Sequence, residues 1–295
     1  MSHSDLRIDL HTHSTGSDGT DTPSELMRAA AAAGLDVIAL TDHDSTGGWD
    51  QATAALPAGL TLVPGAELSC CWHTGDGRTI SVHLLAYLFD PGSEAMLAEQ
   101  RRLRAERRSR LHTMAGRMAA DGLPVDPDAL LGQLAPDVPA GRPHLARALV
   151  DAGVVRTVDE AFSRYLASGR SYYVPRADTP VESAIDMVAD AGGVTVLAHP
   201  FAHDRGPTID ADVIATLAAR GLTGVEVDHP NHDQRARARL RELAAELDLL
   251  PTGSSDYHGT NKQIALGAET TDPDVYSELL RLGRGSTAVR GEGGR

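Results

Sequence analysis

Histidine and acidic side chains recur where predicted strands end, and their spacing indicates metal chemistry. His11 and His13 flank one residue at the end of a strand, so both imidazoles face the same side and can reach one ion. The Asp42–Asp44 triplet follows the next predicted strand. A lone His-x-His pair also fits two surface histidines, but coincidence becomes improbable as such positions accumulate. The other candidates are Asp18, His43, Glu67, His83, His199, Asp256 and His258.

These imidazoles and carboxylates outnumber the ligands that one tetrahedral ion takes. Their mixture of nitrogen and oxygen donors suits borderline or hard divalent cations such as Mn²⁺, Zn²⁺ or Fe²⁺. We therefore expect a cluster of two or three divalent ions.

Short β-rich runs alternating with helical patterns predict the framework that positions these residues. Thr22, Pro23 and Glu25 form the pattern of a capped helix start, and that helix should run to about Ala33. Strands and helices in alternation predict parallel βαβ units, whose functional side chains gather at the carboxyl ends of the strands. The predicted strands are Leu6–Leu10, Asp36–Thr41, Leu60–Pro64, Thr79–Phe89, Gly193–Ala198, Leu222–Val227 and Leu250–Ser254, and the later helices are Thr179–Ala191, Asp210–Ala219 and Asp233–Leu247.

The alternation is interrupted in the middle of the chain. A long helical stretch from Ser93 to about Ala120 is followed by shorter helical patterns, with no convincing strand between about 91 and 170. We expect an α/β barrel of residues 1–92 and 170–295 with an inserted helical subdomain of residues 93–169. The shorter helical patterns cover Asp126–Leu134, Pro143–Ala152 and Val158–Ser168.

Two arginine-bearing segments have less specific interpretations. The run Arg101–Arg110 fits nucleic-acid binding or a solvated helix face, and nearby Glu99 and Glu106 favour the solvated face. The Gly- and Arg-rich tail Gly283–Arg295 is expected to fray.

Composition limits the partners and the compartment. A formal net charge of −14 argues against holding duplex DNA by its phosphates. The longest apolar runs are too short to span a membrane, and the first residues lack a secretory signal pattern, so we expect a cytoplasmic protein with no membrane partner. Cys70 and Cys71 are adjacent, which excludes an ordinary disulfide between them. The sequence indicates no oligomeric state.

Taken with their sequence context, these residues resemble the PHP (polymerase and histidinol phosphatase) family of metal-dependent phosphoesterases. The likeness spans roughly residues 6 to 268, and two inserted motifs resemble a branch with nucleoside 3′,5′-bisphosphate phosphatases and 5′→3′ oligoribonucleotide exonucleases. The family-wide motifs are DLHTHSTGSDG (9–19), ALTDHDSTGG (39–48), PGAELS (64–69), VHLLAY (82–87), VLAHP (196–200) and GSSDYHG (253–259), and the branch motifs are GRPHLARALV (141–150) and SGRSYYVPR (168–176).

The resemblance implies a distorted (β/α)7 barrel and a trinuclear centre. On that model one ion is held by His11, His13, Glu67 and Asp256. Glu67 bridges to a second ion that His83 and His199 complete, and Asp18, His43 and His258 hold the third. All nine positions carry a side chain able to bind metal, so a catalytically dead relative is not expected.

The implied activity is hydrolysis of a nucleotide phosphate ester by a metal-activated hydroxide, with Asp18, His43, Glu67 and His258 at the reacting centre. No G-x-S-x-G nucleophile motif supports a covalent route. The favoured substrate is a nucleoside 3′,5′-bisphosphate. The alternatives are 5′→3′ exonuclease action on short RNA, histidinol-phosphate phosphatase activity, and a non-catalytic metal-binding module.

Further residues are candidates for contacting the substrate. Arg142 could hold phosphate in a bidentate fork or cap the following helix. His144 could contact substrate, pack or cap, and Arg176 could contact phosphate or base. His229 and His232 follow the strand Leu222–Val227 and either support the metal ligands or contact substrate. Either His232 or a metal-bound water could protonate the leaving group.

Overall fold

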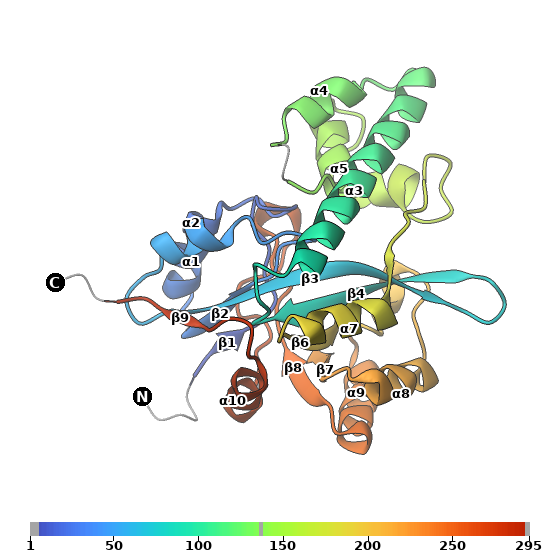
Figure 1. Cartoon of the computed structure of the whole chain (residues 1–295). Coiled ribbons are helices and arrows are strands. Elements are labelled where there is room, and N and C mark those ends of the chain that lie inside the picture. The colour runs from blue at the N-terminus through green and yellow to red at the C-terminus, as the bar shows by residue number, and fades with distance from the viewer. Residues whose placement is uncertain (1–5, 136–137, 293–295) are drawn as a thin grey trace.

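The computed structural model describes residues 6–135 and 138–292, and its strands and helices follow the predicted order closely (Figure 1). The strands are β1 Ile8–Asp9, β2 Val37–Leu40, β3 Thr61–His73, β4 Thr79–Tyr87, β5 Thr179–Pro180, β6 Val194–Ala198, β7 Gly224–Asp228, β8 Leu250–Gly253 and β9 Val289–Arg290. The α-helices are α1 Pro23–Ala32, α2 Trp49–Ala54, α3 Glu94–Ala120, α4 Pro127–Gly132, α5 Arg142–Asp151, α6 Val158–Ala161, α7 Val181–Asp190, α8 Ala211–Arg220, α9 Gln234–Leu247 and α10 Pro273–Leu282. Shorter turns of helix are η2 Phe162–Leu166, η3 His203–Arg205 and η4 Gly259–Asn261.

Seven strands form a nearly closed barrel in the order β1-β2-β3-β4-β6-β7-β8. Beyond the ends of β8 and β1, Thr12 and Tyr257 form a parallel bridge, and the Thr271 amide donates to the Ile8 carbonyl at 2.9 Å. The barrel therefore comes close to closing on itself, which agrees with the predicted (β/α)7 architecture.

The expectation of parallel pairing throughout is wrong at β3 and β4. These two strands form an antiparallel hairpin, with Glu67 opposite Leu85, and β4 also runs antiparallel to β6. The connection from His73 to Thr79 is a tight turn with Gly77 at a φ of +84°. A turn this short permits only antiparallel pairing, because a parallel crossover needs a dozen or more residues.

The barrel interior is packed with aliphatic side chains up to the level of the candidate ligands. Leu85 and Tyr87 point inward from β4, and alternation along the strand places His83 on the same face. Tyr276 and Leu279 of α10 pack against this interior cluster. The inner apolar layer thus supports a polar layer at one end.

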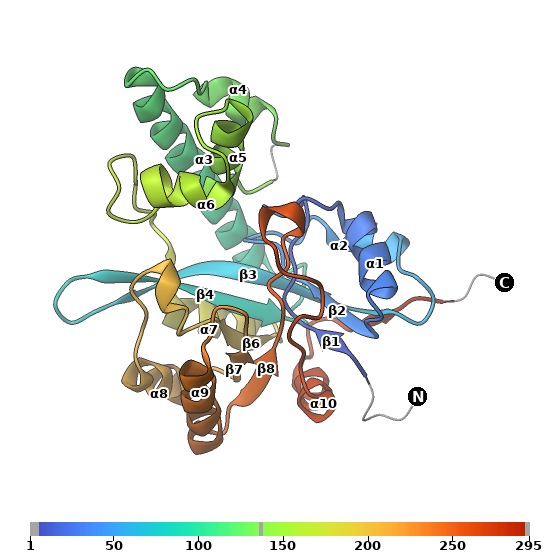
Figure 2. The same ribbon diagram turned by 180° about the vertical axis from the view of Figure 1, so that it is seen from behind.

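The helices between β4 and β5 build a core of their own. Leu111, Met114 and Met118 of α3 pack with Leu145 and Leu149 of α5. Figures 1 and 2 show this green insertion standing on one side of the barrel. No strand occurs between β4 and β5 in the described part of this segment. The exact division at residues 93 and 169 stays a prediction.

The interpretation of Arg101–Arg110 as a solvated face is wrong for several of its arginines. Arg107 is buried, and its Nε donates to Asp44 Oδ2 at 2.5 Å. Arg110 Nε donates to the Val174 carbonyl at 2.5 Å, and Arg104 Nη1 donates to the Asp44 carbonyl at 2.9 Å. The run therefore fastens α3 to the barrel and to the rest of the insertion.

The expectation of a frayed tail is also wrong for its described residues. β9 pairs with β3, with Leu62 opposite Val289. A Cβ on Gly285 would overlap the backbone of Asp90, so glycine is what allows the tail to lie against the barrel. The helix α10 just before it was not anticipated at all.

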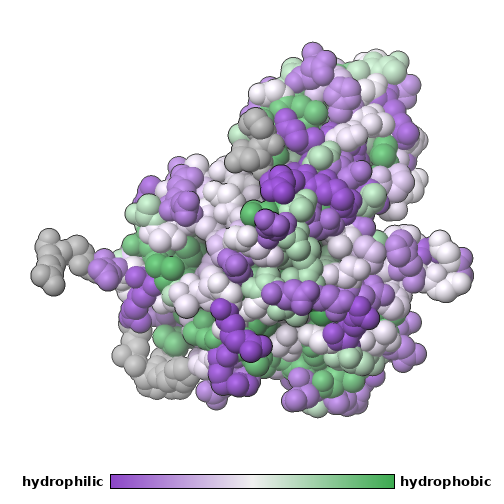
Figure 3. Space-filling view, viewed as in Figure 1, coloured by the Kyte–Doolittle hydropathy of each residue, from purple (hydrophilic) through white to green (hydrophobic). Residues whose placement is uncertain are grey.

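The visible surface is mostly hydrophilic, with small apolar patches between polar ones (Figure 3). Across the described residues, Val289 is the one large hydrophobic side chain classed as exposed, at 36%. None of the helices in this part of the chain is long and apolar enough to cross a membrane.

Candidate metal centre

The structure brings all nine predicted metal ligands together at one end of the barrel. They come from the carboxyl ends of strands or from the loops just beyond, except for Glu67 and His83, which lie within the β3–β4 hairpin. Two of the backbone positions are strained: His199 and Asp256 adopt φ values of +31° and +53°. The nine residues are His11, His13, Asp18, His43, Glu67, His83, His199, Asp256 and His258.

Glu67 lies at the middle of the group and its two oxygens face different histidines. Oε1 lies 2.7 Å from His83 Nδ1 and 3.1 Å from His199 Nε2. Oε2 lies 3.1 Å from both His13 Nε2 and His43 Nδ1. This placement is what a carboxylate that bridges two ions requires.

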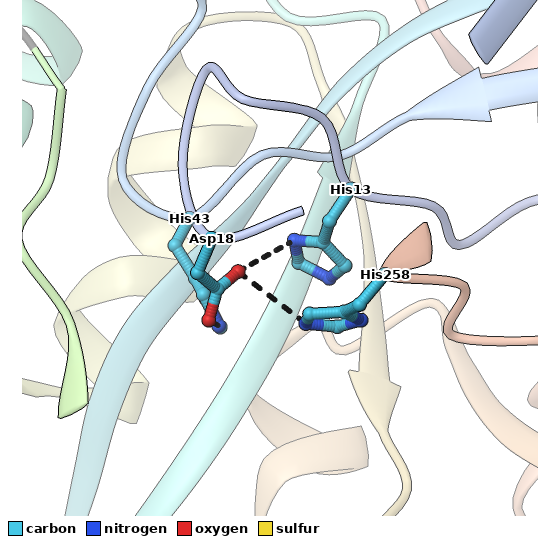
Figure 4. A group of neighbouring side chains, drawn as sticks. All are labelled: His13, Asp18, His43 and His258. Carbon is cyan, nitrogen blue, oxygen red and sulfur yellow. Dashed lines mark ion pairs between the residues drawn. The ribbon is translucent and has the colours of Figure 1, made fainter. Parts of the chain in front are cut away.

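A second group surrounds Asp18 (Figure 4). Its Oδ1 lies 3.3 Å from His258 Nε2 and 3.7 Å from His13 Nδ1, and its Oδ2 lies 3.7 Å from His43 Nε2. One ligand atom from each of these four residues can lie within 4.8 Å of the others. In Figure 4 the Asp18 carboxylate points between His13 and His258.

Asp256 supplies the third carboxylate. Its Oδ1 lies 3.5 Å from Nε2 of both His11 and His13, and its Oδ2 faces away toward Lys262 Nζ at 2.6 Å. His11, His13 and Asp256 form a further group with the spacing of a metal site.

The donor set fits divalent ions better than it fits a network of hydrogen bonds. The Nε2 atoms of His11 and His13 lie only 3.1 Å apart, and both lie near Glu67 Oε2. His43 Nδ1 is buried, and its approach to Glu67 does not have hydrogen-bond geometry. Converging imidazole nitrogens and carboxylate oxygens are the donors that divalent transition metals prefer.

Burial and charge divide the histidines into two classes in the metal-free protein. Burial lowers the pKa of His13, but the carboxylates of Asp256, Glu67 and Asp18 outweigh it and raise the pKa to about 9. Burial lowers the pKa of His258 to about 4, with His13 and Lys262 adding to the effect. Metal binding at His13 must therefore displace a proton, because imidazole binds metal only in its neutral form.

Sequence reasoning missed a layer of buried carboxylates behind the ligands. Glu226 Oε1 lies 3.1 Å from His11 Nδ1, and its Oε2 accepts from the His199 amide at 2.7 Å. Ser254 also donates to Glu226. A carboxylate behind a histidine fixes the orientation of the ring. The sequence did contain one sign of this role, because Glu226 is a single acidic residue between Val225 and Val227 in an otherwise apolar strand.

Asp9, Asp42 and Asp44 support the loops that carry the ligands. Asp9 Oδ1 accepts from the Ser255 amide at 3.0 Å, next to Asp256. Asp42 Oδ1 accepts from the Ser14 amide at 2.8 Å, and Asp44 Oδ1 accepts from the Ser69 amide at 2.7 Å. The Asp42–Asp44 triplet was singled out in the sequence, but these roles were not.

His229 and His232 lie at the rim after β7, as expected, with their ring nitrogens engaged. His229 Nε2 lies 3.3 Å from Asp256 Oδ2, and His229 Nδ1 accepts from the Asn231 amide at 3.0 Å. His232 Nδ1 donates to the Val227 carbonyl at 2.9 Å, and its Nε2 accepts from the Phe201 amide at 3.3 Å. These contacts favour a supporting role for both residues over proton transfer to a leaving group.

A cationic cluster lies in the insertion, and its Arg142 directly follows Gly141, where a Cβ would lie 3.9 Å from Asp18 Oδ2. Arg110 and Arg142 lie over the ring of Tyr173, with the guanidinium carbons 5.1 and 5.7 Å from its centroid. Burial and the neighbouring guanidiniums of Arg142 and Arg176 lower the pKa of Arg110 to about 9, and burial and Arg176 lower that of Arg142 to about 10.

The charges of this cluster are only partly balanced. Arg176 pairs with Asp178, its Nε lying 2.8 Å from Oδ1. Arg110 and Arg142 donate instead to the carbonyls of Val174 and Leu166, and within the described chain neither forms an ion pair with a carboxylate. Two crowded guanidiniums without an acidic partner make this a favourable place for an anion.

His144 lies between the insertion and the metal centre. The Gly141 amide donates to His144 Nδ1 at 3.0 Å, so His144 caps α5, which was one of the roles open to it. His144 also lines the same pocket as Ser17, the residue before Asp18. The start of α5 therefore lies close to the ligands, since a Cβ on Gly141 would be 3.9 Å from Asp18 Oδ2.

Comparison with known proteins finds relatives over most of the chain and a solved structure with this fold. The PHP domain model matches residues 9–112. A 3′,5′-nucleoside bisphosphate phosphatase of Chromobacterium violaceum is 34% identical over 85% of this chain and 87% of its own length. A 5′-3′ exoribonuclease of Haemophilus influenzae is 33% identical over 88% of this chain and 93% of its own. The crystal structure of a putative metal-dependent phosphoesterase from Bifidobacterium adolescentis is 36% identical with a TM-score of 0.88, and covers 95% of this chain and 97% of that one.

A nearly closed seven-strand barrel with this cluster of ligands defines a metal-dependent phosphoesterase, which is therefore an enzyme and not a passive metal-binding module. The chain belongs to the PHP family.

Proposed function

We propose that this phosphoesterase removes the 3′-phosphate of a nucleoside 3′,5′-bisphosphate, giving a nucleoside 5′-phosphate and inorganic phosphate. The observation that carries this proposal is the pair of acid-free guanidiniums, Arg110 and Arg142, beside the metal centre. Gly141 connects the two places, because a Cβ on it would lie 3.9 Å from Asp18 Oδ2. A substrate with two phosphates can place one in each. The relative from C. violaceum carries the name of this activity.

The proposal assigns the nine ligands to two or three ions of Mn²⁺, Zn²⁺ or Fe²⁺. Glu67 would serve two groups, one with His11, His13 and Asp256 on the side of Oε2 and one with His83 and His199 on the side of Oε1. Asp18, His43 and His258 form the third group. Bound divalent ions supply a more acidic water and neutralise charge on the phosphate oxygens.

The chain's own residues do the positioning. Glu226 and His229 hold His11 and Asp256 in place, so their donor atoms keep facing the centre. We assign Asp18, His43, Glu67 and His258 to the reacting end, and His232 to a supporting role through its two backbone contacts. Arg142 and Arg110 would hold the distal phosphate, with Arg176 beside them in the same cluster. His144, near the start of α5, lines one pocket with Ser17, the residue before Asp18. A cytoplasmic location is part of this proposal.

A second candidate is 5′→3′ exonuclease action on short RNA. The same cationic cluster would accept the phosphate at the 5′ end of an oligonucleotide, and the relative from H. influenzae carries that name. A histidinol-phosphate phosphatase is less well supported, because a substrate with one phosphate leaves Arg110 and Arg142 without a partner.

Two substrates offered in parallel to Mn²⁺-loaded protein test the proposal. Adenosine 3′,5′-bisphosphate should yield adenosine 5′-monophosphate and phosphate, while a 5′-phosphorylated RNA pentamer stays intact. Stepwise release of 5′-mononucleotides from the pentamer would replace the first candidate by the second. If neither substrate is hydrolysed, the nucleotide assignment is wrong.

A further inference from the structure

The helix α5 of the insertion reaches the loop that follows β8. Arg147 Nη2 donates to Asn261 Oδ1 at 2.7 Å, and Asn261 Nδ2 in turn donates to the Asp18 carbonyl at 2.8 Å. Asn261 lies three residues after His258. Figure 2 shows the orange segment after β8 lying beneath the green helices of the insertion. Arg147 of the insertion is thus linked through Asn261 to the backbone of Asp18 and to the loop that carries His258.

Other contacts join the insertion to the same group. His144, also on α5, lines one pocket with Ser17, the residue before Asp18. Arg104 and Arg107 of α3 donate to the carbonyl and carboxylate of Asp44, the residue after His43. Asp44 has a φ of +50°, a conformation that needs such support.

The ligands around Glu67 are held in a different way. Glu67 and His83 lie within β3 and β4, where β3 from Gly65 to His73 pairs with the whole of β4. His199 directly follows β6, which pairs with β4 up to Ala198. Arg107 Nη2 does reach Ser69 at 2.5 Å, but β3 is already held by β2 and β4. The sheet is sufficient to position this group, whereas Asp18 and His258 lie on irregular backbone.

We propose that the insertion positions the ion site formed by His13, Asp18, His43 and His258, with Arg147 as the positioning residue, while the site around Glu67, His83 and His199 forms without it. This inference deepens the proposed function, on which it rests for the role of the ions. Its consequence is reciprocal coupling: an ion at Asp18 favours the docked insertion, and a docked insertion tightens that ion.

The test is ion binding by the full-length protein without substrate. Metal-stripped wild type, R147M and R147K are titrated with Mn²⁺ by calorimetry, and the ions retained after desalting are counted by mass spectrometry. R147M should weaken one class of ion roughly 10-fold, within the range seen when an outer partner of a ligand is lost, and leave the others unchanged. R147K should recover part of the loss. R117M is the matched control, because Arg117 is exposed on α3 in the same insertion.

A second variant covers the case in which R147M fails to fold. N261A breaks the same connection from the barrel side, and should weaken the same single class of ion. If both variants fold, the double variant R147M/N261A should cost no more than N261A alone, because N261A already removes the partner of Arg147. Wild-type affinity for every ion in both variants, or an equal loss at all sites, overturns the inference.

Hydrogen exchange gives a readout independent of affinity. Mn²⁺ should slow exchange in residues 142–151 and 258–262 of wild type, and in R147M the effect on 142–151 should disappear. Unchanged slowing in R147M contradicts the coupling. Because no nucleotide is present in any of these experiments, a failure of the proposed substrate leaves their outcome intact.

Discussion

At the scale of single residues, the site depends on how buried charges are balanced. Glu67 is buried among histidines, and His83, His43 and His11 hold its pKa well below the usual value although burial acts in the opposite direction. The metal centre is thus prepared as an array of charges before any ion binds. Burying a single charge without a partner costs free energy, so removing one charged residue should destabilise the buried charges that remain.

Glu226 offers the clearest test of the layer behind the ligands. Glu226→Gln keeps the size of the side chain but removes the charge that faces His11 Nδ1. Metal affinity should fall about 10- to 100-fold, since outer partners of ligands have effects of this order. Titration of the metal-stripped variant with Mn²⁺ measures the change. Glu182→Gln, on the surface helix α7, serves as control. If Glu226→Gln binds Mn²⁺ as tightly as wild type, Glu226 does not support the metal site.

Ion binding should release protons near neutral pH. The pKa of His13 is about 9 without metal, so at pH 7.5 its imidazole carries a proton that an ion must displace. As pH rises through 9 that proton is lost without metal, so apparent affinity should increase up to about pH 9 and level off above it. Calorimetry in two buffers of different ionisation enthalpy should show release of about one proton or more per chain at pH 7.5. Binding heats that are independent of buffer would argue against the protonated state.

Arg142 should discriminate substrates by their second phosphate. Arg142→Ala removes a guanidinium that would pair with the distal phosphate, a contact worth about 1.5–3 kcal/mol, or roughly 10- to 150-fold in kcat/KM. Adenosine 3′-monophosphate lacks that phosphate, so its hydrolysis should change little. Steady-state kinetics with both substrates decides the point, and equal losses on both would mean that Arg142 supports the fold or the centre instead.

At the scale of elements, two glycines are expected to respond in opposite ways to substitution by alanine. Gly253 is required by close packing, whereas Gly116 only lowers the helix propensity of α3. A Cβ on Gly253, at the end of β8, would overlap the Thr270 carbonyl, whereas a Cβ on Gly116, within α3, would meet nothing within 4 Å. Gly253→Ala should lower the free energy of unfolding by about 1–3 kcal/mol through overpacking. Gly116→Ala should raise it by up to about 1 kcal/mol. Thermal and urea unfolding report both, and similar effects of the two changes would refute the distinction.

Some elements could be predicted from local sequence and others could not. The helix α1 was predictable because Thr22 and Glu25 form a reciprocal cap, which the structure confirms. The antiparallel pairing of β3 and β4 was missed because β3 continues nine residues beyond the predicted Leu60–Pro64 run, through Glu67 to His73. The tail was misjudged because its glycines resemble a flexible segment, although here they permit close packing.

At the scale of the whole molecule, the gathering of the nine candidate ligands was predictable, because histidine and acidic residues are rare in sheet interiors and here occur at strand ends. Their supports were not, because Glu226 or Asp9 alone in an apolar strand has no distinctive spacing. Arg107 was misjudged for a similar reason: an arginine on a long helix gives no sign of the distant Asp44 that pairs with it. The sequence does not reveal which residues distant along the chain contact each other in the folded protein.

The most direct test of the central claim is ion-dependent phosphate release. Metal-stripped protein is mixed with adenosine 3′,5′-bisphosphate, Mn²⁺ is added stepwise, and phosphate is measured beside the number of bound ions, for wild type and Glu67→Gln. We predict no release without ions, release that rises with occupancy in wild type, and a loss of at least about 100-fold in kcat for Glu67→Gln, the order seen when a group stabilising transition-state charge is removed. Release by stripped protein, or near wild-type rates in Glu67→Gln, would contradict the account.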